Sequence, residues 1–186
     1  MPVIGIISRL VHQKGFDLVT AAMEALLARP IRMVVLGTGE PDVEEGLREF
    51  VRRDPGRFGV RFQYDSGLAH RIEAGCDMIL MPSRFEPCGL TQMYSMRYGT
   101  IPIVRKTGGL ADTVEHFDPK RKTGTGFVFE HADTTGLVWA IDEALSAYAK
   151  PGLWSVLMQN AMTRDFSWAL SAERYEAVYS HAQYSV

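Results

Sequence analysis

Short apolar runs alternate with longer stretches of helical spacing along most of the chain. The apolar runs occupy residues 3–8, 31–36, 60–64, 78–81, 101–104 and 126–129, and each has the length and make-up of a buried parallel strand. Helical spacing covers residues 17–28, 41–53, 68–74, 90–98, 109–116, 133–147 and 151–162, and a last stretch reaches about residue 181. The pattern predicts an α/β fold, a doubly wound parallel sheet of about six strands flanked by helices.

Length and charge narrow the class of protein further. The 186 residues suit a single domain, residues 1–186, and 46% of them are hydrophobic, as in a globular chain with a real core. A net charge of −2 favours neither nucleic acid nor an anionic membrane, and no apolar run approaches the ~20 residues that span a bilayer. The two cysteines, Cys76 and Cys88, are too few for a disulfide framework or a zinc site and suit a reducing, cytosol-like compartment.

The most informative turn spans residues 82–92, Pro-Ser-Arg-Phe-Glu-Pro-Cys-Gly-Leu-Thr-Gln, between an apolar run and a helical stretch. A helix that begins there directs free N–H groups and partial positive charge at the turn, which suits phosphate or sugar oxygens. Glu86 adds a fixed carboxylate. The combination predicts a ligand with both hydroxyls and phosphates. The alternative is a tight strand–helix turn whose glutamate is merely solvated.

Basic residues and glycines follow two other predicted strands. Arg9 carries a planar guanidinium that can donate two hydrogen bonds to phosphate oxygens, and Lys14 adds a second positive charge. The pair is therefore a candidate diphosphate-binding site. The alternative is that the two residues are unrelated charges in a solvated loop. Gly37 and Gly39 resemble half of a dinucleotide-binding fingerprint. Because Asp42 occupies the place of the third glycine, an NAD-dependent enzyme is disfavoured, and a close backbone approach to a ligand or a plain tight turn remains.

Two more predicted strand ends carry candidate ligand contacts. Gly108 and Gly109 stand at another predicted helix start, where no side chain would keep a phosphate or sugar from the backbone N–H groups. The alternative is a glycine-rich helix start without a ligand. Tyr64 ends the third predicted strand, where its ring could stack on a base or belong to the core. Parallel strands place their carboxyl ends at one edge of a sheet, so we expect all these residues to converge there.

At this point the motifs resemble a known family: the C-terminal, nucleotide-sugar-binding half of bacterial glycogen synthases and plant starch synthases, which are retaining glucosyltransferases of the GT-B fold. The resemblance covers essentially all 186 residues. It rests on Ser-Arg-Leu at 8–10, Gln-Lys-Gly at 13–15, Leu-Gly-Thr-Gly at 36–39, Ala-His-Arg-Ile at 69–72, the turn at 82–92, Arg-Tyr-Gly-Thr at 97–100, Thr-Gly-Gly-Leu-Ala-Asp-Thr-Val at 107–114 and Asp-Phe-Ser-Trp at 165–168. The turn at 82–92 is the most specific of these.

The resemblance implies a catalytic set of Arg9, Lys14 and Glu86. The two cations would bind the diphosphate of ADP-glucose and stabilise the departing ADP, and Glu86 would hold hydroxyls of the donor glucose. The implied reaction transfers glucose, with retention, to the 4-hydroxyl at the non-reducing end of an α-1,4-glucan. The implied donor-binding residues are Gly37, Gly39, Tyr64 (stacked on the adenine), Cys88, Gly89, Thr91, Thr107, Gly108 and Gly109.

No metal and no cofactor besides the nucleotide-sugar substrate is expected on this interpretation, and the sequence contains no Asp-x-Asp. An N-terminal domain, absent from this chain, would supply the acceptor contacts, so the isolated domain should bind nucleotide but be nearly inactive. The alternative function is a non-catalytic adenine-nucleotide-binding or regulatory module of the same fold. The implied location is the bacterial cytoplasm, or the plastid of a plant. Tyr175, Tyr179 and Tyr184 in the last helical stretch are a candidate contact surface, or else an ordinary packed helix.

Overall fold

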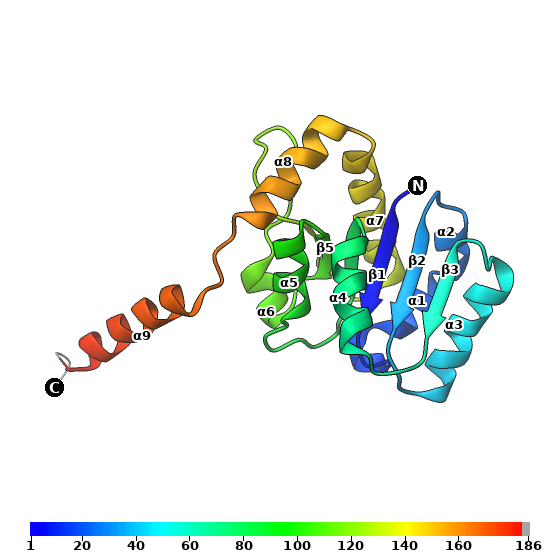
Figure 1. Cartoon of the computed structure of the whole chain (residues 1–186), viewed down its shortest axis with the longest axis horizontal. Helices are drawn as coiled ribbons and strands as arrows, with labels where there is room; N and C mark the ends of the chain where they lie inside the picture. The colour runs from blue at the N-terminus through cyan, green and yellow to red at the C-terminus, as the bar shows by residue number, and fades with distance from the viewer. Residues whose placement is uncertain (184–186) are drawn as a thin grey trace.

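The computed structural model describes residues 1–183 and contains one open sheet of six parallel strands (Figure 1). The strands are β1 (Val3–Ile7), β2 (Arg32–Leu36), β3 (Phe58–Arg61), β4 (Met78–Met81), β5 (Ile101–Arg105) and β6 (Phe127–Phe129). Their order across the sheet is β3-β2-β1-β4-β5-β6, and every neighbouring pair is parallel. This is the strand order of doubly wound nucleotide-binding folds, and it confirms the predicted fold class. Tyr184, part of the candidate contact surface, lies outside the described residues.

The third strand differs most from its predicted range. We expected residues 60–64, whereas β3 begins at Phe58 and ends at Arg61. Among the described residues its only strand partner is β2, whose last residue, Leu36, is paired with Arg61. Because β2 ends there, the ladder ends too, and Tyr64 lies in the loop beyond the strand.

Helices connect the strands and follow them. They are η1 (His12–Lys14), α1 (Phe16–Ala21), α2 (Met23–Leu27), α3 (Pro41–Arg53), α4 (Ser66–Gly75), α5 (Thr91–Tyr98), α6 (Gly108–Thr113), α7 (Thr134–Tyr148), α8 (Pro151–Met162) and α9 (Trp168–Gln183). The stretch predicted as one helix over residues 17–28 is divided at Ala22, whose φ of −86° and ψ of 7° depart from helical values. The helix predicted over 109–116 ends early because Val114 is extended, and His116 pairs with Gly126 in an isolated parallel bridge.

Helices cover both faces of the sheet. α3, α1 and α7 pack side by side on one face, and α4, α5 and α6 pack on the other, while α8 contacts both α5 and α7 (Figure 1). The apolar residues between these layers form one continuous core. α9 extends away from this body and buries no residue. No helix within residues 1–183 is long and apolar enough to cross a membrane.

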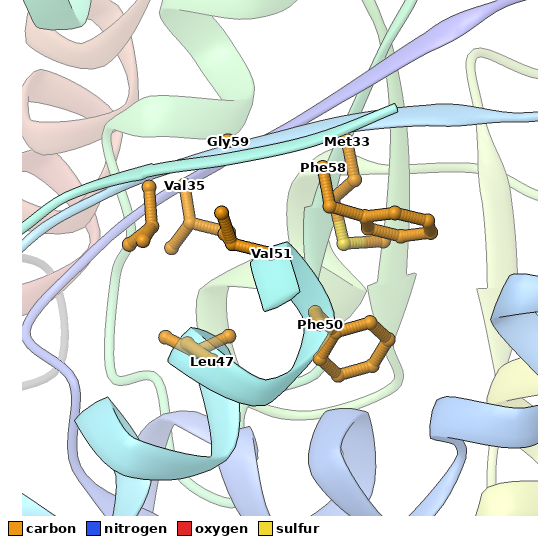
Figure 2. A pocket seen from close by; sticks show the side chains of 8 residues that line it. Met33, Val35, Leu47, Phe50, Val51, Phe58 and Gly59 are labelled. Carbon is orange, nitrogen blue, oxygen red and sulfur yellow. The ribbon is translucent and has the colours of Figure 1, made fainter. Parts of the chain in front are cut away.

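α3 shows how local signals fix the helical layer. Pro41 stands in its first turn with acidic residues, and Arg52 and Arg53 close its last turn, which matches the helix dipole at both ends. On its inner face Phe50 packs on Phe58 of β3, with ring centroids 5.3 Å apart (Figure 2). The gap between α3 and the sheet has a volume of only about 10 Å³, at the lower limit for one water molecule, so it is a packing defect and not a ligand site.

Candidate functional site

The strand order reverses between β1 and β4, which are neighbours at the centre of the sheet. The chain leaves β1 toward β2 and leaves β4 toward β5, so the two loops that follow diverge. Open α/β sheets bind their ligands at this position. The loop after β1 carries Arg9 and Lys14, and the loop after β4 carries Glu86. The fold therefore brings to one place the two loops that hold the residues assigned catalytic roles.

Lys14 and Glu86 form a direct ion pair. The Lys14 ammonium donates to Glu86 Oε2 at 2.6 Å, and the Ser83 hydroxyl donates to the same oxygen at 3.2 Å. The side chains of Lys14 and Glu86 are only 17% and 10% exposed. A pair this shielded from water interacts more strongly than a surface pair. The ammonium of Lys14 therefore stands directly beside the carboxylate of Glu86, a contact that was not predicted from the sequence.

The backbone also joins these two loops. Gly15 has a φ of 76°, and a Cβ at this position would overlap the carbonyl oxygen of Pro82. The Arg84 N–H donates to the carbonyl of Gln13 at 2.9 Å. The Arg84 side chain reaches Asp17 at 2.5 Å, at the start of α1. Glycine at position 15 is thus required for the contact that brings Lys14 to Glu86.

Arg105 holds the turn before Glu86 from the neighbouring strand. Its Nε donates to the Ser83 carbonyl at 2.7 Å and a terminal nitrogen donates to the Arg84 carbonyl at 2.5 Å. Burial of the guanidinium, and then the charge of Arg84, lower the pKa of Arg105. The carbonyl of Glu86 itself accepts from the Gly109 N–H at 3.0 Å. Arg105 therefore holds the turn on one side of Glu86 and Gly109 holds the Glu86 backbone, and no local sequence pattern indicates the contribution of Arg105.

The glycines that follow β2 serve packing between loops. A Cβ at Gly37 would overlap the carbonyl oxygen of Ser8, and one at Gly39 would overlap that of Leu10. The Leu10 N–H donates to the Thr38 carbonyl at 2.9 Å, which extends the parallel pairing of β1 and β2 into their loops. The expected close backbone approach is real, but its partner in this structure is the loop after β1.

The glycines beyond β5 behave in the same way. Gly108 has a φ of 42°, and a Cβ at Gly109 would overlap the carbonyl oxygen of Cys88. The buried amide of Gln92 completes the contact, because its Nε2 donates to the carbonyls of Cys88 at 3.2 Å and Gly89 at 2.9 Å. The turn after Glu86 and the start of α6 thus form one packed unit.

The start of α5 supplies hydrogen-bond donors to this unit. α5 begins at Thr91, and its N-cap residue, Leu90, makes no side-chain cap. The first N–H groups of an uncapped helix have no partner within the helix, and they carry partial positive charge. Thr91, the first residue of α5, is half-buried, and Cys88, two residues before the N-cap, is exposed. The arrangement can hold an anion next to the Glu86 carboxylate.

Three other predicted site residues stand at the same edge without close partners. Arg9 is exposed, and within residues 1–183 its side chain makes no hydrogen bond or ion pair. Tyr64 is 93% exposed, which excludes the alternative that it belongs to the core. Thr107 is half-buried at the N-cap of α6, and its side chain caps no N–H there. All three are available to a ligand at the carboxyl edge of the sheet.

One cluster at this edge was not grouped from the sequence. His12 Nε2 lies 3.0 Å from Asp42 Oδ2 and 3.3 Å from Glu40 Oε2. The hydrogen bond with Asp42 and the charge of Glu40 raise the pKa of His12. These three side chains have ligand atoms close enough together to suit a metal ion, but an imidazolium between two carboxylates accounts for the same geometry. The cluster ties the loop after β1 to the start of α3.

Comparisons with known proteins agree with this architecture. Residues 1–153 match the family model described as glycosyl transferases group 1. The chain is 52% identical over 179 residues to a glycogen synthase of Anaeromyxobacter sp. (strain Fw109-5), covering 96% of this chain and 38% of that protein. It is 51% identical over 183 residues to a glycogen synthase of Cellvibrio japonicus (strain Ueda107), covering 97% of this chain and 38% of that protein.

The solved structures point the same way. The catalytic domain of starch synthase IV from Arabidopsis thaliana, bound to ADP and acarbose, superposes with a TM-score of 0.86 at 38% identity, over 97% of this chain and 38% of that one. Sucrose-phosphate synthase from Thermosynechococcus elongatus, at 24% identity and a TM-score of 0.71, shares the fold. The chain thus spans 38% of the length of these two glycogen synthases and of the starch synthase IV chain. With its family model, its relatives and its strand order in agreement, this chain belongs to the group 1 glycosyl transferases.

Proposed function

We propose that this chain is the donor-binding half of a glycogen or starch synthase, which transfers glucose from ADP-glucose, with retention, to the 4-hydroxyl at the non-reducing end of an α-1,4-glucan. The observation that carries the proposal is the Lys14–Glu86 pair, which stands beside the uncapped start of α5 where the strand order reverses. A cation and the N–H groups of a helix start suit the oxygens of a diphosphate, and a carboxylate suits the hydroxyls of the attached sugar. The ADP bound to starch synthase IV supports adenine as the base.

On this proposal each residue has a distinct task. Arg9 and Lys14 bind the diphosphate, and Tyr64 stacks on the adenine. Glu86 accepts hydrogen bonds from hydroxyls of the donor glucose, and the start of α5 donates N–H groups to phosphate or sugar oxygens.

As the bond to the anomeric carbon breaks, positive charge grows on the sugar and negative charge on the departing diphosphate. Fixed cations and helix N–H groups stabilise that negative charge without reorganising, which lowers the barrier. Loss of either cation should slow transfer by roughly ten- to a hundred-fold, the equivalent of about 1.5–3 kcal/mol for a charge-assisted hydrogen bond.

The acceptor contacts belong to the part of the synthase that this chain does not include, so the chain alone is expected to bind nucleotide and to transfer almost no glucose. The mechanism requires no metal and no cofactor besides the nucleotide sugar. The chain spans 38% of the length of its Anaeromyxobacter relative, so glucose transfer is a property of the longer enzyme.

Calorimetric titration with ADP, UDP and NAD tests the proposal. ADP should bind more tightly than UDP or NAD, and an Arg9→Ala/Lys14→Ala double variant should lose that binding. The matched control replaces two basic residues far from this edge, Arg52→Ala/Arg53→Ala in the last turn of α3, and should leave it intact. Preferred binding of NAD, or ADP binding that survives the Arg9→Ala/Lys14→Ala change, contradicts the assignment.

A further inference from the structure

A second concave surface lies at the β6 edge of the sheet, apart from the Lys14–Glu86 pair. It is a groove of about 440 Å³ with walls from α6, β6 and α7. Ala111 of α6 and Val128 of β6 contribute apolar surface, and Trp139 of α7 forms one wall. The volume falls within the range of small-ligand sites, about 300–1,000 Å³. Nothing in the proposed donor site uses this groove.

The Trp139 side chain is exposed but held in place. It is 46% exposed, whereas Trp154, on the neighbouring helix α8, is 8% exposed and belongs to the core. The indole stacks on the imidazole of His116, with centroids 5.5 Å apart and planes 11° apart. His116 is fixed in turn, because its Nδ1 accepts the Val128 N–H at 3.1 Å and its ring meets Phe127 edge-on.

A fixed, solvated indole is a preorganised binding surface. Water contacts the indole at a free-energy cost that a ligand with an apolar face would remove. Because stacking on His116 already restricts the ring, a ligand that covers it loses little further side-chain entropy. The electron-rich face of such a ring favours C–H groups and other positively polarised atoms.

The polar part of the groove is electrically balanced. Lys106 and Glu130, which follow β5 and β6, pair at 2.7 Å with side chains 57% and 64% exposed. Their charges cancel, so the groove has no excess charge to attract a phosphate or a carboxylate. An exposed pair contributes little to stability, and its ammonium and carboxylate remain able to donate to and accept from hydroxyl groups.

We propose that this groove binds a neutral oligosaccharide chain, with the C–H face of one pyranose ring against Trp139 and its hydroxyls hydrogen-bonded to Lys106 and Glu130. A pyranose combines an apolar face with a rim of uncharged hydroxyls, and this is the combination that the groove offers. The choice of an oligosaccharide also rests on the proposed function, in which a glucan chain is both acceptor and product. A second glucan contact on the donor domain would keep the polymer bound while one chain end leaves the acceptor site and another enters it.

Native gel electrophoresis of this chain through gels containing increasing soluble glycogen tests the proposal, with Trp139→Ala as the main variant. The matched control is Trp168→Ala, because Trp168 is 84% exposed but stands on α9 and does not line this groove. Wild type and Trp168→Ala should be retarded equally. Trp139→Ala should lose at least about five-fold in apparent affinity, and Trp139→Phe should keep part of it. Maltoheptaose cast into the gel together with the glycogen should reduce the retardation by competition.

Thermal unfolding and an ADP titration of Trp139→Ala accompany the gels. Because the replaced side chain is half exposed, the unfolding temperature and the ADP affinity of the variant should both match those of the wild type. A loss of glycogen affinity alone then reports on the groove. Absence of retardation in the wild type, or equal retardation of Trp139→Ala and wild type, overturns the proposal. The ADP titration of the wild type judges the proposed donor site separately, because it requires no glucan.

Discussion

Replacing Lys14 by methionine is expected to lower the free energy of unfolding, although the new side chain fills a similar volume. The change removes the ammonium 2.6 Å from Glu86 Oε2 and leaves a carboxylate that is 10% exposed, with the Ser83 hydroxyl as its remaining partner. Breaking a fully buried pair costs about 3–5 kcal/mol, and a charged hydrogen bond is worth about 1.5–3 kcal/mol. Since both side chains keep some contact with water, we expect a loss of about 2–3 kcal/mol.

A double-mutant cycle separates the pair from other effects of each substitution. Glu86→Gln should cost less than Lys14→Met, because the 17% exposed ammonium can turn toward water. The double variant should be more stable than the two single losses predict, with a coupling energy of at least about 1 kcal/mol. The assay is urea unfolding at low ionic strength without nucleotide, because urea, unlike guanidinium, does not screen charges.

The exposed Lys106–Glu130 pair is the matched control for this cycle. It has the same chemistry and nearly the same distance, 2.7 Å, but its side chains are 57% and 64% exposed. In the same low-salt assay its cycle should show a coupling below about 0.5 kcal/mol. The reasoning is refuted if the Lys14–Glu86 coupling is as small as that of the exposed pair, because burial would then not be the cause of its strength.

Three further predictions follow from other contacts. The hydrogen bond with Asp42 raises the pKa of His12 above its ordinary 6.5. The interaction therefore stabilises the folded state fully below about pH 6.5, and this stabilisation is lost as the pH rises through the higher pKa of the folded state. NMR titration of the imidazole should show the raised pKa, and Asp42→Asn should lower it. Burial, and then the charge of Asp77, raises the pKa of Cys76 to about 12. Iodoacetamide at pH 8 should therefore label only the exposed Cys88 until the chain unfolds, and ADP should slow the labelling of Cys88. Detection of labelled Cys76 in the folded chain by mass spectrometry would contradict this prediction. Gly109→Ala should cost about 2–3 kcal/mol in urea unfolding, because its Cβ would overlap the Cys88 carbonyl, and an unchanged midpoint would contradict the packing role.

Much of the fold follows from local sequence signals. The run 78–81 has no charged residue, and it became β4 with the predicted bounds, buried between β1 and β5. Pro41 marked the start of α3, and Pro151 that of α8. Boundaries that depend on a distant neighbour were less predictable: β3 ends where β2 ends, and the sequence around Tyr64 does not contain that information. α4 begins at Ser66, two residues before the predicted stretch, because the Asp65 carboxylate caps it by accepting the Leu68 N–H at 2.8 Å.

The candidate site was predictable in its position but not in its contacts. Strand-end residues converge because parallel strands share an edge, and this follows from the α/β pattern alone. The ion pair of Lys14 and Glu86 joins residues 72 positions apart, and only the β1–β4 adjacency reveals it. The stack of Trp139 on His116 likewise joins two elements whose pairing no local pattern encodes.

The central claim is that a nucleotide diphosphate binds between the loops after β1 and β4. An ADP titration of isotope-labelled chain, followed by backbone amide NMR, tests it most directly. The account predicts that the largest shift changes fall on the amides of Gly15, Gly89 and Gly109, at the carboxyl edge of the sheet, and that Gly152 at the start of α8 does not respond. Saturable changes confined to other parts of residues 1–183, or no change at ADP concentrations that saturate the calorimetric titration, would contradict the account.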